Sequence, residues 1–297
     1  MPAIGSLETP SGAVDHGGGH AGAGDNRLLN GIIDAVLILI CAVMLLPLVF
    51  LVANAFKTQQ ELLSWPPTVV PRAPTLENIR SVLGDTPLLR WILNSLVFAA
   101  LSTVAIVATS ALTGYILGKF RFPGVNVLFA VILATAIVPF EVYMIPLYLN
   151  VQALGLLNSL WGLLIGYLVM SFGIFLIRQY VIASIPDELI EAARIDGASE
   201  SWIFVRIIVP LLRGPLGALS VLAFFQAWTA FVWPLLVATT KESYTLEVGL
   251  ALFQTGFTVD LGRLSAAAAL ALVPSVLFFA FMRRHFVQGV AATGLKE

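Results

Sequence analysis

Six long apolar runs constrain this chain more than any other feature, because each can cross a bilayer as a helix. A spanning helix needs about twenty mostly apolar residues. The fifth run is over-long and contains Pro215 and Pro234, so we expect it to tilt or to end near Trp233. The six runs cover residues 31–53, 92–117, 125–149, 159–178, 209–237 and 264–282.

Composition supports an integral membrane protein. The chain is 59% hydrophobic and only 11% charged, whereas soluble domains average about 25% charged residues. We therefore predict an all-α membrane protein with six transmembrane helices, in contact with membrane lipid. The net charge of −1 gives no reason to expect a nucleic-acid partner. Cys41 has no partner cysteine, and the histidines at 16, 20 and 285 lie outside the runs, so we predict no metal site and no catalytic site.

The first residues differ from the rest of the chain. Residues 1–26 are rich in glycine, alanine and serine and are predicted to be a disordered tail, whereas 27–297 form the membrane domain. No basic segment precedes a short apolar core, so the first run is expected to remain as a helix and not to be cleaved as a signal peptide.

The distribution of lysine and arginine predicts the orientation. If the N-terminus is inside, most of these residues fall on the inner side, as the positive-inside rule requires. Both termini, and the polar segment 184–210, are then predicted to be cytoplasmic. Six basic residues remain on the outer side: Lys57, Arg72, Arg80, Arg90, Lys241 and Arg263.

The polar segment 184–210, between the fourth and fifth runs, has the signals of a short helix. Ser184 to Asp187 has the form of a capping box, with Pro186 near the first helical position. Asp187 would lie in the first turn, where the helix dipole favours negative charge. The expected helix is about ten residues or roughly 15 Å long, too short and too charged to span a bilayer.

The end of this helix is also marked. Gly197 can adopt the left-handed conformation that ends helices, and Ser199 can cap a second helix. A surface helix of this kind can enter a groove on another protein. It can equally be an amphipathic connector that rests on lipid. The residue pattern alone leaves both interpretations open.

The same segment resembles a known motif. Glu191-Ala192-Ala193, three residues, Gly197, nine residues and Ile207-Ile208-Val209-Pro210 resemble the "EAA" loop of membrane subunits of binding-protein-dependent ABC importers. The departure is Val209 in place of leucine. The resemblance implies a type I ABC importer fold and a coupling helix that docks into a cleft on a cytoplasmic ATPase. It assigns coupling to Glu191, Ala192, Ala193, Arg194, Asp196 and Gly197.

The resemblance also implies partners and a location. We expect a homologous permease subunit, two cytoplasmic ATPase subunits and an extracytoplasmic solute-binding protein, in the cell membrane of a prokaryote. Gly118-Lys119 is not a phosphate loop, because the glycine five residues earlier is missing and Phe120 replaces the serine or threonine that binds magnesium. We therefore expect this chain to bind no cofactor and to lack an ATPase site, with ATP and magnesium on the partner.

Polar and aromatic residues within the runs are candidates for a translocation path. We take Glu141 to be the one acidic residue well inside an apolar run, where a charge costs roughly 2.5–3.5 kcal/mol on insertion scales. It should face an aqueous path or be paired with another helix. Asn94, Gln226, Trp228 and Trp233 are added because sugar faces stack on aromatic rings and sugar hydroxyls bind amides and carboxylates. Core packing is the alternative for each.

Further segments are similar to the carbohydrate branch of these permeases, the maltose- and glycerol-3-phosphate-type second subunit. They are Phe224–Trp228, Trp233–Leu235, Arg121–Gly124 and Arg283–Gly289; Thr229 and Leu261 depart from the pattern. This resemblance implies a sugar or sugar derivative as the solute. An importer of another small solute is the alternative. A stand-alone secondary transporter is less favoured, because it should show several intramembrane charges and inverted repeats with broken helices.

Overall fold

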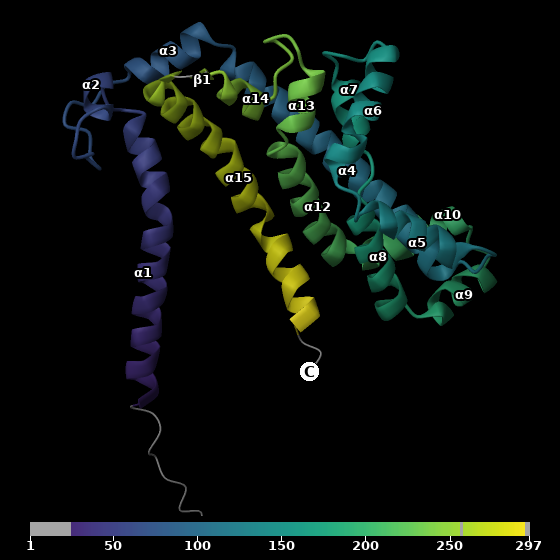
Figure 1. The fold of residues 1–297 in the computed structure, drawn as a ribbon. Coiled ribbons are helices and arrows are strands. Elements are labelled where there is room, and N and C mark those ends of the chain that lie inside the picture. The colour runs from purple at the N-terminus through teal and green to yellow at the C-terminus, as the bar shows by residue number, and fades with distance from the viewer. Residues whose placement is uncertain (1–24, 256–257, 295–297) are drawn as a thin grey trace, which may run out of the picture. The chain divides into compact units, whose positions relative to one another are not determined.

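The computed structural model describes residues 25–255 and 258–294 (Figure 1). The chain divides into two units, residues 1–50 and 51–297, and each is described by itself. The tail predicted for residues 1–26 lies outside the described residues except for its last two positions, which open the first helix.

The first unit contributes most of α1 (Asp25–Asn54), the helix predicted for the first apolar run. As a single helix, it presents apolar side chains on every side. It also carries Asp34. Glu141 is therefore not the only acidic residue inside an apolar run, and the sequence reasoning overlooked Asp34.

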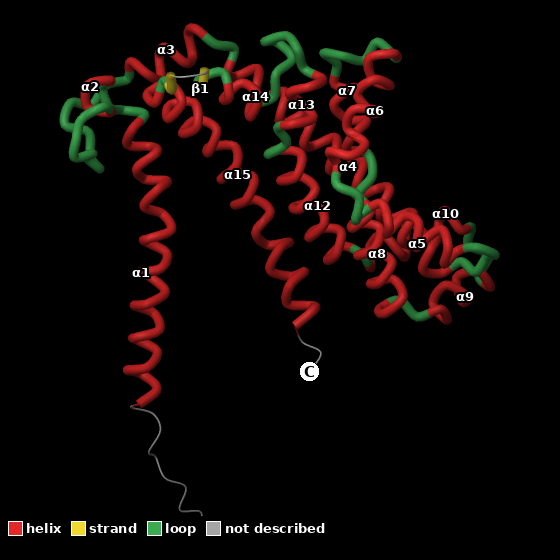
Figure 2. The backbone as a smooth tube through the Cα atoms, in the orientation of Figure 1, coloured by secondary structure: helices red, strands yellow, loops and turns green. Residues whose placement is uncertain are grey.

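Helices make up most of the second unit, as Figure 2 shows, together with one pair of two-residue strands. The strands pair antiparallel, Gln254 with Val259 and Thr255 with Thr258. The elements are α2 (Gln59–Leu62), α3 (Glu77–Asp85), α4 (Leu88–Lys119), α5 (Val125–Thr135), α6 (Phe140–Ala153), α7 (Leu160–Leu164), the 3-10 helix η1 (Ile165–Tyr167), α8 (Ser171–Ser184), α9 (Asp187–Ile195), α10 (Glu200–Ile203), the π-helix η2 (Phe204–Ile208), α11 (Val209–Leu211), α12 (Arg213–Trp228), α13 (Val232–Val237), α14 (Leu246–Ala251), β1 (Gln254–Thr255), β2 (Thr258–Val259) and α15 (Leu261–Gly294).

Three described helices are long and apolar enough to cross a membrane without a break. They contain Leu29–Asn54, Leu88–Lys119 and Leu261–Phe278. Bent pairs raise the number of spans to six. The pairs are Val125–Thr135 with Phe140–Ala153, bent by 94°; Leu160–Tyr167 with Ser171–Ser184, bent by 48°; and Glu200–Leu211 with Arg213–Trp228, bent by 78°.

The six predicted spans thus have counterparts, but three predicted continuous helices are wrong. The run 125–149 breaks before Pro139, whose ring removes a backbone donor. The run 209–237 contains a bend at Leu212, and its helix α12 ends at Trp228. Trp233 therefore does not end the fifth span; it lies in the separate short helix α13.

Helix α4 packs against α8 and α12 and carries much of the core. Its Gly114 faces α8, and a Cβ there would lie 2.9 Å from the backbone nitrogen of Arg178. Glycine at this position lets the two backbones approach closely. Buried side chains form two clusters, one around Trp91, Phe98 and Trp233 and the other around Ile177, Ile203 and Leu219.

Candidate functional site

Helix α9 lies where the short polar helix was predicted, but it begins differently from the sequence prediction. The capping box predicted at Ser184 is wrong, because Ser184 is the last residue of α8. Pro186 takes the N-cap position of α9, and no side chain caps that end. Asp187 and Glu188 do lie in the first turn, where their charge complements the helix dipole.

Lys119 ties the start of α9 to the end of α4. Its Nζ lies 2.5 Å from Asp187 Oδ1 and also donates to the carbonyl of Ile185 at 2.5 Å. The Lys119 side chain is only 7% exposed, whereas that of Asp187 is 58% exposed. The hydrogen bond and the positive charge of Lys119 lower the pKa of Asp187. The ion pair fixes the α8–α9 junction against a membrane helix.

The far end of α9 is closed by a left-handed turn. Gly197 has φ +82°, and the backbone N–H of Ala198 donates to the carbonyl of Ala193 at 3.0 Å. Ser199 accepts a hydrogen bond from the backbone N–H of Trp202 at 3.3 Å, so the predicted cap of the second helix is confirmed.

A charged pair connects the two helices across this turn. Arg194 Nε lies 2.6 Å from Glu200 Oε1, and this hydrogen bond raises the pKa of Arg194. The Arg194 guanidinium also lies 5.8 Å from the centroid of the Phe120 ring. Helix α9, the Gly197 turn and α10 are therefore held as one piece.

The faces of α9 differ in burial. Ile190 and Ala193 belong to the Ile177 cluster, so they anchor the helix to the membrane core. Leu189 is 40% exposed, and Ile195 is 87% exposed at the tip. Glu191 and Ala192 are exposed as well. One face of α9 is therefore packed against the described chain, and the other is left uncovered by it.

Hollows lie on both sides of α9. One, of about 360 Å³, is polar and is lined by Lys119, Phe120, Arg121, Asp187, Ile190, Glu191 and Arg194. The other, of about 640 Å³, lies between α9 and α10 and is lined by Leu189, Ala192, Ala193, Asp196, Gly197, Ala198, Ser199, Trp202 and Ile207. All six residues that the resemblance assigned to coupling thus line one hollow or the other.

A rigid segment joins this loop to the fifth span. After α10 the chain forms the π-helix η2 and then α11, and Ile203, Ile208 and Leu212 are fully buried along the way. The 78° bend to α12 follows at Leu212. No sequence signal that we used indicated the π-helical turn, because its residues are ordinary helix formers.

A second site lies where the broken spans meet. A cavity of about 500 Å³ is bordered by the breaks of two bent spans, 135–140 between α5 and α6 and 166–171 between η1 and α8, and by residues 229–232, which connect α12 to α13. The bend of the fifth span at Leu212 does not border it. The hydroxyls of Thr135 and Ser171 are 2.7 Å apart, which links two of the breaks. The lining side chains include Thr135, Phe140, Glu141, Tyr143, Tyr167, Ser171, Phe172, Gln226, Thr229, Phe231 and Trp233.

Three of the five residues predicted for the path lie at this cavity. Glu141 and Gln226 are exposed there. Trp233 contributes to the wall while its indole Nε1 donates to the carbonyl of Leu163 at 3.0 Å. Phe140 meets the Trp233 ring edge-on, with centroids 5.9 Å apart. The hydrogen bond fixes the Trp233 ring, and Trp233 in turn fixes the position of the Phe140 ring.

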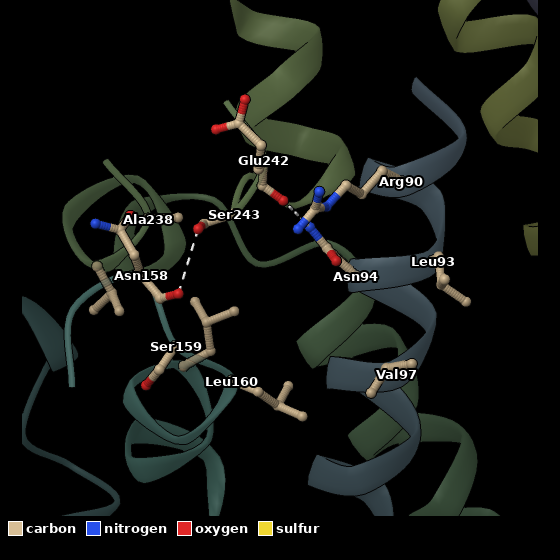
Figure 3. A pocket seen from close by; sticks show the side chains of 12 residues that line it. Arg90, Leu93, Asn94, Val97, Asn158, Ser159, Leu160, Ala238, Glu242 and Ser243 are labelled. Atoms are coloured by element: carbon tan, nitrogen blue, oxygen red, sulfur yellow. Dashed lines mark hydrogen bonds between the residues drawn. The ribbon is translucent and has the colours of Figure 1, made fainter. Parts of the chain in front are cut away.

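The other two residues lie elsewhere. Trp228 is buried and stacks on Phe224 with ring centroids 5.9 Å apart, so it belongs to the core. Asn94 lines a separate cavity of about 230 Å³, shown in Figure 3, where its Nδ2 donates to the carbonyls of Glu242 and Tyr244, both at 2.9 Å. Neither residue lines the cavity at the breaks.

The sequence reasoning missed Asn158, which organises the same separate cavity. Its φ is +58°, and its Oδ1 accepts hydrogen bonds from the backbone N–H groups of Thr239 (2.7 Å) and Thr240 (3.1 Å). Ser243 Oγ donates to its carbonyl (Figure 3). Asparagine before a helix cap is a local signal for a left-handed turn that could have identified it.

Within the part of the chain that the structure describes, no group of three or more His, Cys, Asp or Glu side chains is placed to hold a metal ion.

Comparison with known proteins identifies the family. Residues 110–292 match the model described as "Binding-protein-dependent transport system inner membrane component". The arabinooligosaccharides transport system permease protein AraQ of Bacillus subtilis (strain 168) is 31% identical over 255 residues, covering 85% of this chain and 90% of that protein. The sn-glycerol-3-phosphate transport system permease protein UgpE of Escherichia coli O1:K1 / APEC is 35% identical over 263 residues, covering 86% and 93%.

A solved structure shares the fold. It is the crystal structure of a bacterial ABC transporter involved in the import of the acidic polysaccharide alginate, with a TM-score of 0.73 and 24% identity over 89% of this chain and 98% of that one. The expected type I ABC importer fold is thereby confirmed. This chain belongs to the family of binding-protein-dependent transport system inner membrane components and is a permease subunit of an ABC importer.

Proposed function

We propose that this subunit forms half of the translocation path of an importer for a sugar or sugar derivative, driven by separate ATPase subunits. The solutes named for the relatives, arabinooligosaccharides and sn-glycerol 3-phosphate, support the carbohydrate class. The expected complex contains a homologous permease subunit, two ATPase subunits and an external solute-binding protein. Its ATP and magnesium belong to the ATPase subunits.

The observation that carries the proposal is the construction of α9. The helix is anchored by Ile190 and Ala193, tied to α4 through Lys119 and joined to α10 by the Arg194–Glu200 pair. Its tip residue Ile195 remains uncovered. A partner that pushes this helix would therefore move the ends of α4 and α8 and the η2 segment with it, rather than deform a loop.

The mechanism follows from those connections. When the ATPase subunits close on ATP, the α9–α10 piece moves as a unit. The motion reaches the fifth span through η2 and the bend at Leu212. It reaches α4 through the Lys119 contacts. Because α4 and α12 pack against each other, both change position together and switch the access of the cavity at the breaks.

Site-directed crosslinking tests the docking. In a Cys41→Ser background, Ile195→Cys in the complete complex should crosslink to a nucleotide-hydrolysing subunit. It should be protected from an impermeant thiol reagent added outside cells. Leu63→Cys, at an exposed site on the side predicted to be external, is the matched control and should be labelled from outside. External labelling of Ile195→Cys, or its failure to crosslink to any ATPase in an active complex, would refute the proposal.

A further inference from the structure

We propose that the cavity at the α5–α6 and η1–α8 breaks is a subsite for uncharged carbohydrate and disfavours anionic solutes. This inference rests on the proposed function, because it concerns the solute that the path carries. The relatives differ on this point: their names include a neutral oligosaccharide, a phosphate ester and, for the solved structure, an acidic polysaccharide.

The first argument is the open backbone around the cavity. Helices α5 and α12 and the 3-10 helix η1 end at the cavity, while α6, α8 and α13 begin there. Helix ends leave carbonyl and N–H groups without partners in the helix. At membrane depth such backbone is tolerated only when it is buried in protein or lines a water-filled space. The cavity therefore suits a solute that can replace water as a hydrogen-bond partner.

The second argument is the side-chain lining. The cavity volume, about 500 Å³, lies within the range of roughly 300–1,000 Å³ typical of small-molecule sites. The rings of Phe140, Tyr143 and Tyr167 supply apolar faces, and Gln226 and Thr229 supply donors and acceptors. The Trp233 ring is buried and supports Phe140 from behind. Flat apolar faces beside scattered polar groups match the two faces and the edge hydroxyls of a pyranose or furanose ring.

The third argument is charge. Glu141 is the single carboxylate among the described residues that line the cavity, and no lysine or arginine accompanies it there. The described part of the chain gives Glu141 no hydrogen bond or ion pair. Sites that bind phosphate or carboxylate use arginine or lysine. Here a phosphate ester or a uronate would instead meet a like charge.

The arginine on the neighbouring helix α8 does not offset the negative charge of Glu141. Arg178 lies on α8, but its guanidinium is 4.0 Å from the centroid of the Phe129 ring, and its Nε donates to the carbonyl of Leu117 at 3.1 Å. It is thus committed to the α4–α5–α8 contact and lies outside the lining. The field in the cavity is set by the Glu141 carboxylate and by neutral dipoles.

The test measures solute binding to the assembled complex of permease and ATPase subunits in nanodiscs, without binding protein. The probes are arabinotriose, which is neutral, and trigalacturonate, which has the same number of sugar units and carries carboxylates. Saturation-transfer difference NMR gives the Kd of each. We expect arabinotriose to bind at least about tenfold more tightly. Glu141→Gln keeps the hydrogen-bonding groups and removes the charge, so it should shrink the difference at least about threefold.

A control variant separates local from general charge effects. Glu242→Gln neutralises a carboxylate of the loop in Figure 3, which does not line the cavity at the breaks, and should leave the preference unchanged. The subsite proposal is overturned if trigalacturonate binds as well as arabinotriose, if Glu141→Gln leaves the difference intact, or if neither probe binds. The crosslink of Ile195→Cys in the same preparation reports separately on the proposed importer function.

Discussion

Substitutions at Gly197 give the sharpest test of the coupling loop. A Cβ at this position would meet nothing within 4 Å, so the cost of replacing glycine comes from the left-handed backbone at φ +82° and not from a clash. That conformation costs a residue with a side chain about 1–2 kcal/mol. Asparagine and aspartate tolerate it best, whereas valine tolerates it worst.

The structure therefore predicts an order. Gly197→Asn should keep the turn, because asparagine adopts the left-handed region. Gly197→Ala should shift the turn equilibrium by about five- to thirtyfold, which is the ratio that 1–2 kcal/mol produces. Gly197→Val should open the turn, lose the Ala198-to-Ala193 hydrogen bond and separate Arg194 from Glu200.

Two measurements on the same membranes check the order. Hydrogen exchange at the amide of Ala198 reports on the turn, and solute-stimulated ATPase activity of the complete complex reports on coupling. Exchange should accelerate and coupling should fall in the order Asn, Ala, Val. Equal behaviour of the Asn and Val variants in both assays would refute the argument that backbone conformation is what Gly197 supplies. Gly197→Asp keeps the turn by the same reasoning but adds a charge to the hollow between α9 and α10, so loss of coupling with normal exchange would locate the ATPase contact there.

Other features lead to further expectations. Gly249→Ala would place a Cβ 2.1 Å from the Trp91 ring and should lower stability by about 1–3 kcal/mol, as measured by thermal unfolding; Gly84→Ala, whose Cβ would meet nothing within 4 Å, is the control and should not. Asn158→Ala leaves the N–H groups of Thr239 and Thr240 without their acceptor and should accelerate hydrogen exchange there, while Asn158→Asp should retain protection. The lowered pKa of Asp187 means that its contribution to stability is present above its unfolded pKa of about 3.9 and is lost as the pH falls through the lower folded value; a protease probe of the α8–α9 junction should therefore show no change from pH 8 to pH 5 and faster cleavage as the pH falls below about 3.9, and replacing Lys119 by Met should reduce that acid dependence. Burial raises the pKa of Glu247, so its charged form opposes folding increasingly as the pH rises above about 4.3, and Glu247→Gln should raise the unfolding temperature at pH 7 more than at pH 4.

Hydropathy and motif spacing predicted the apolar runs and the short helix in the polar segment 184–210, but they did not predict the breaks within the runs. The segment around Pro139 is as apolar as the helices that flank it, so a hydropathy window cannot see that the chain turns by 94° there. Ser184 shows the same limitation, because a serine can occupy the end of one helix as readily as the cap of the next. In both cases tertiary packing determines where the helix ends, and the local sequence pattern does not contain that information.

The candidate path was predicted in part for a similar reason. Residue type identified Glu141, Gln226 and Trp233, which the fold brings to one cavity. It also suggested Asn94 and Trp228, whose polar atoms and rings serve a loop and the core instead. Broken helices were expected of a secondary transporter, yet they occur in this permease. They therefore do not separate the two transport classes.

The π-helix at Phe204–Ile208 has a consequence for how this protein can change. A π turn accommodates one residue more than an α turn, and each residue of an α-helix advances the chain by about 100° around its axis. Deleting one residue from this turn would restore regular winding while rotating all of α10 and α9 by about that angle relative to α12. The rotation of α9 relative to α12 is thus set by one extra residue in the π turn. We therefore expect insertions or deletions in this turn to reduce transport far more than substitutions do.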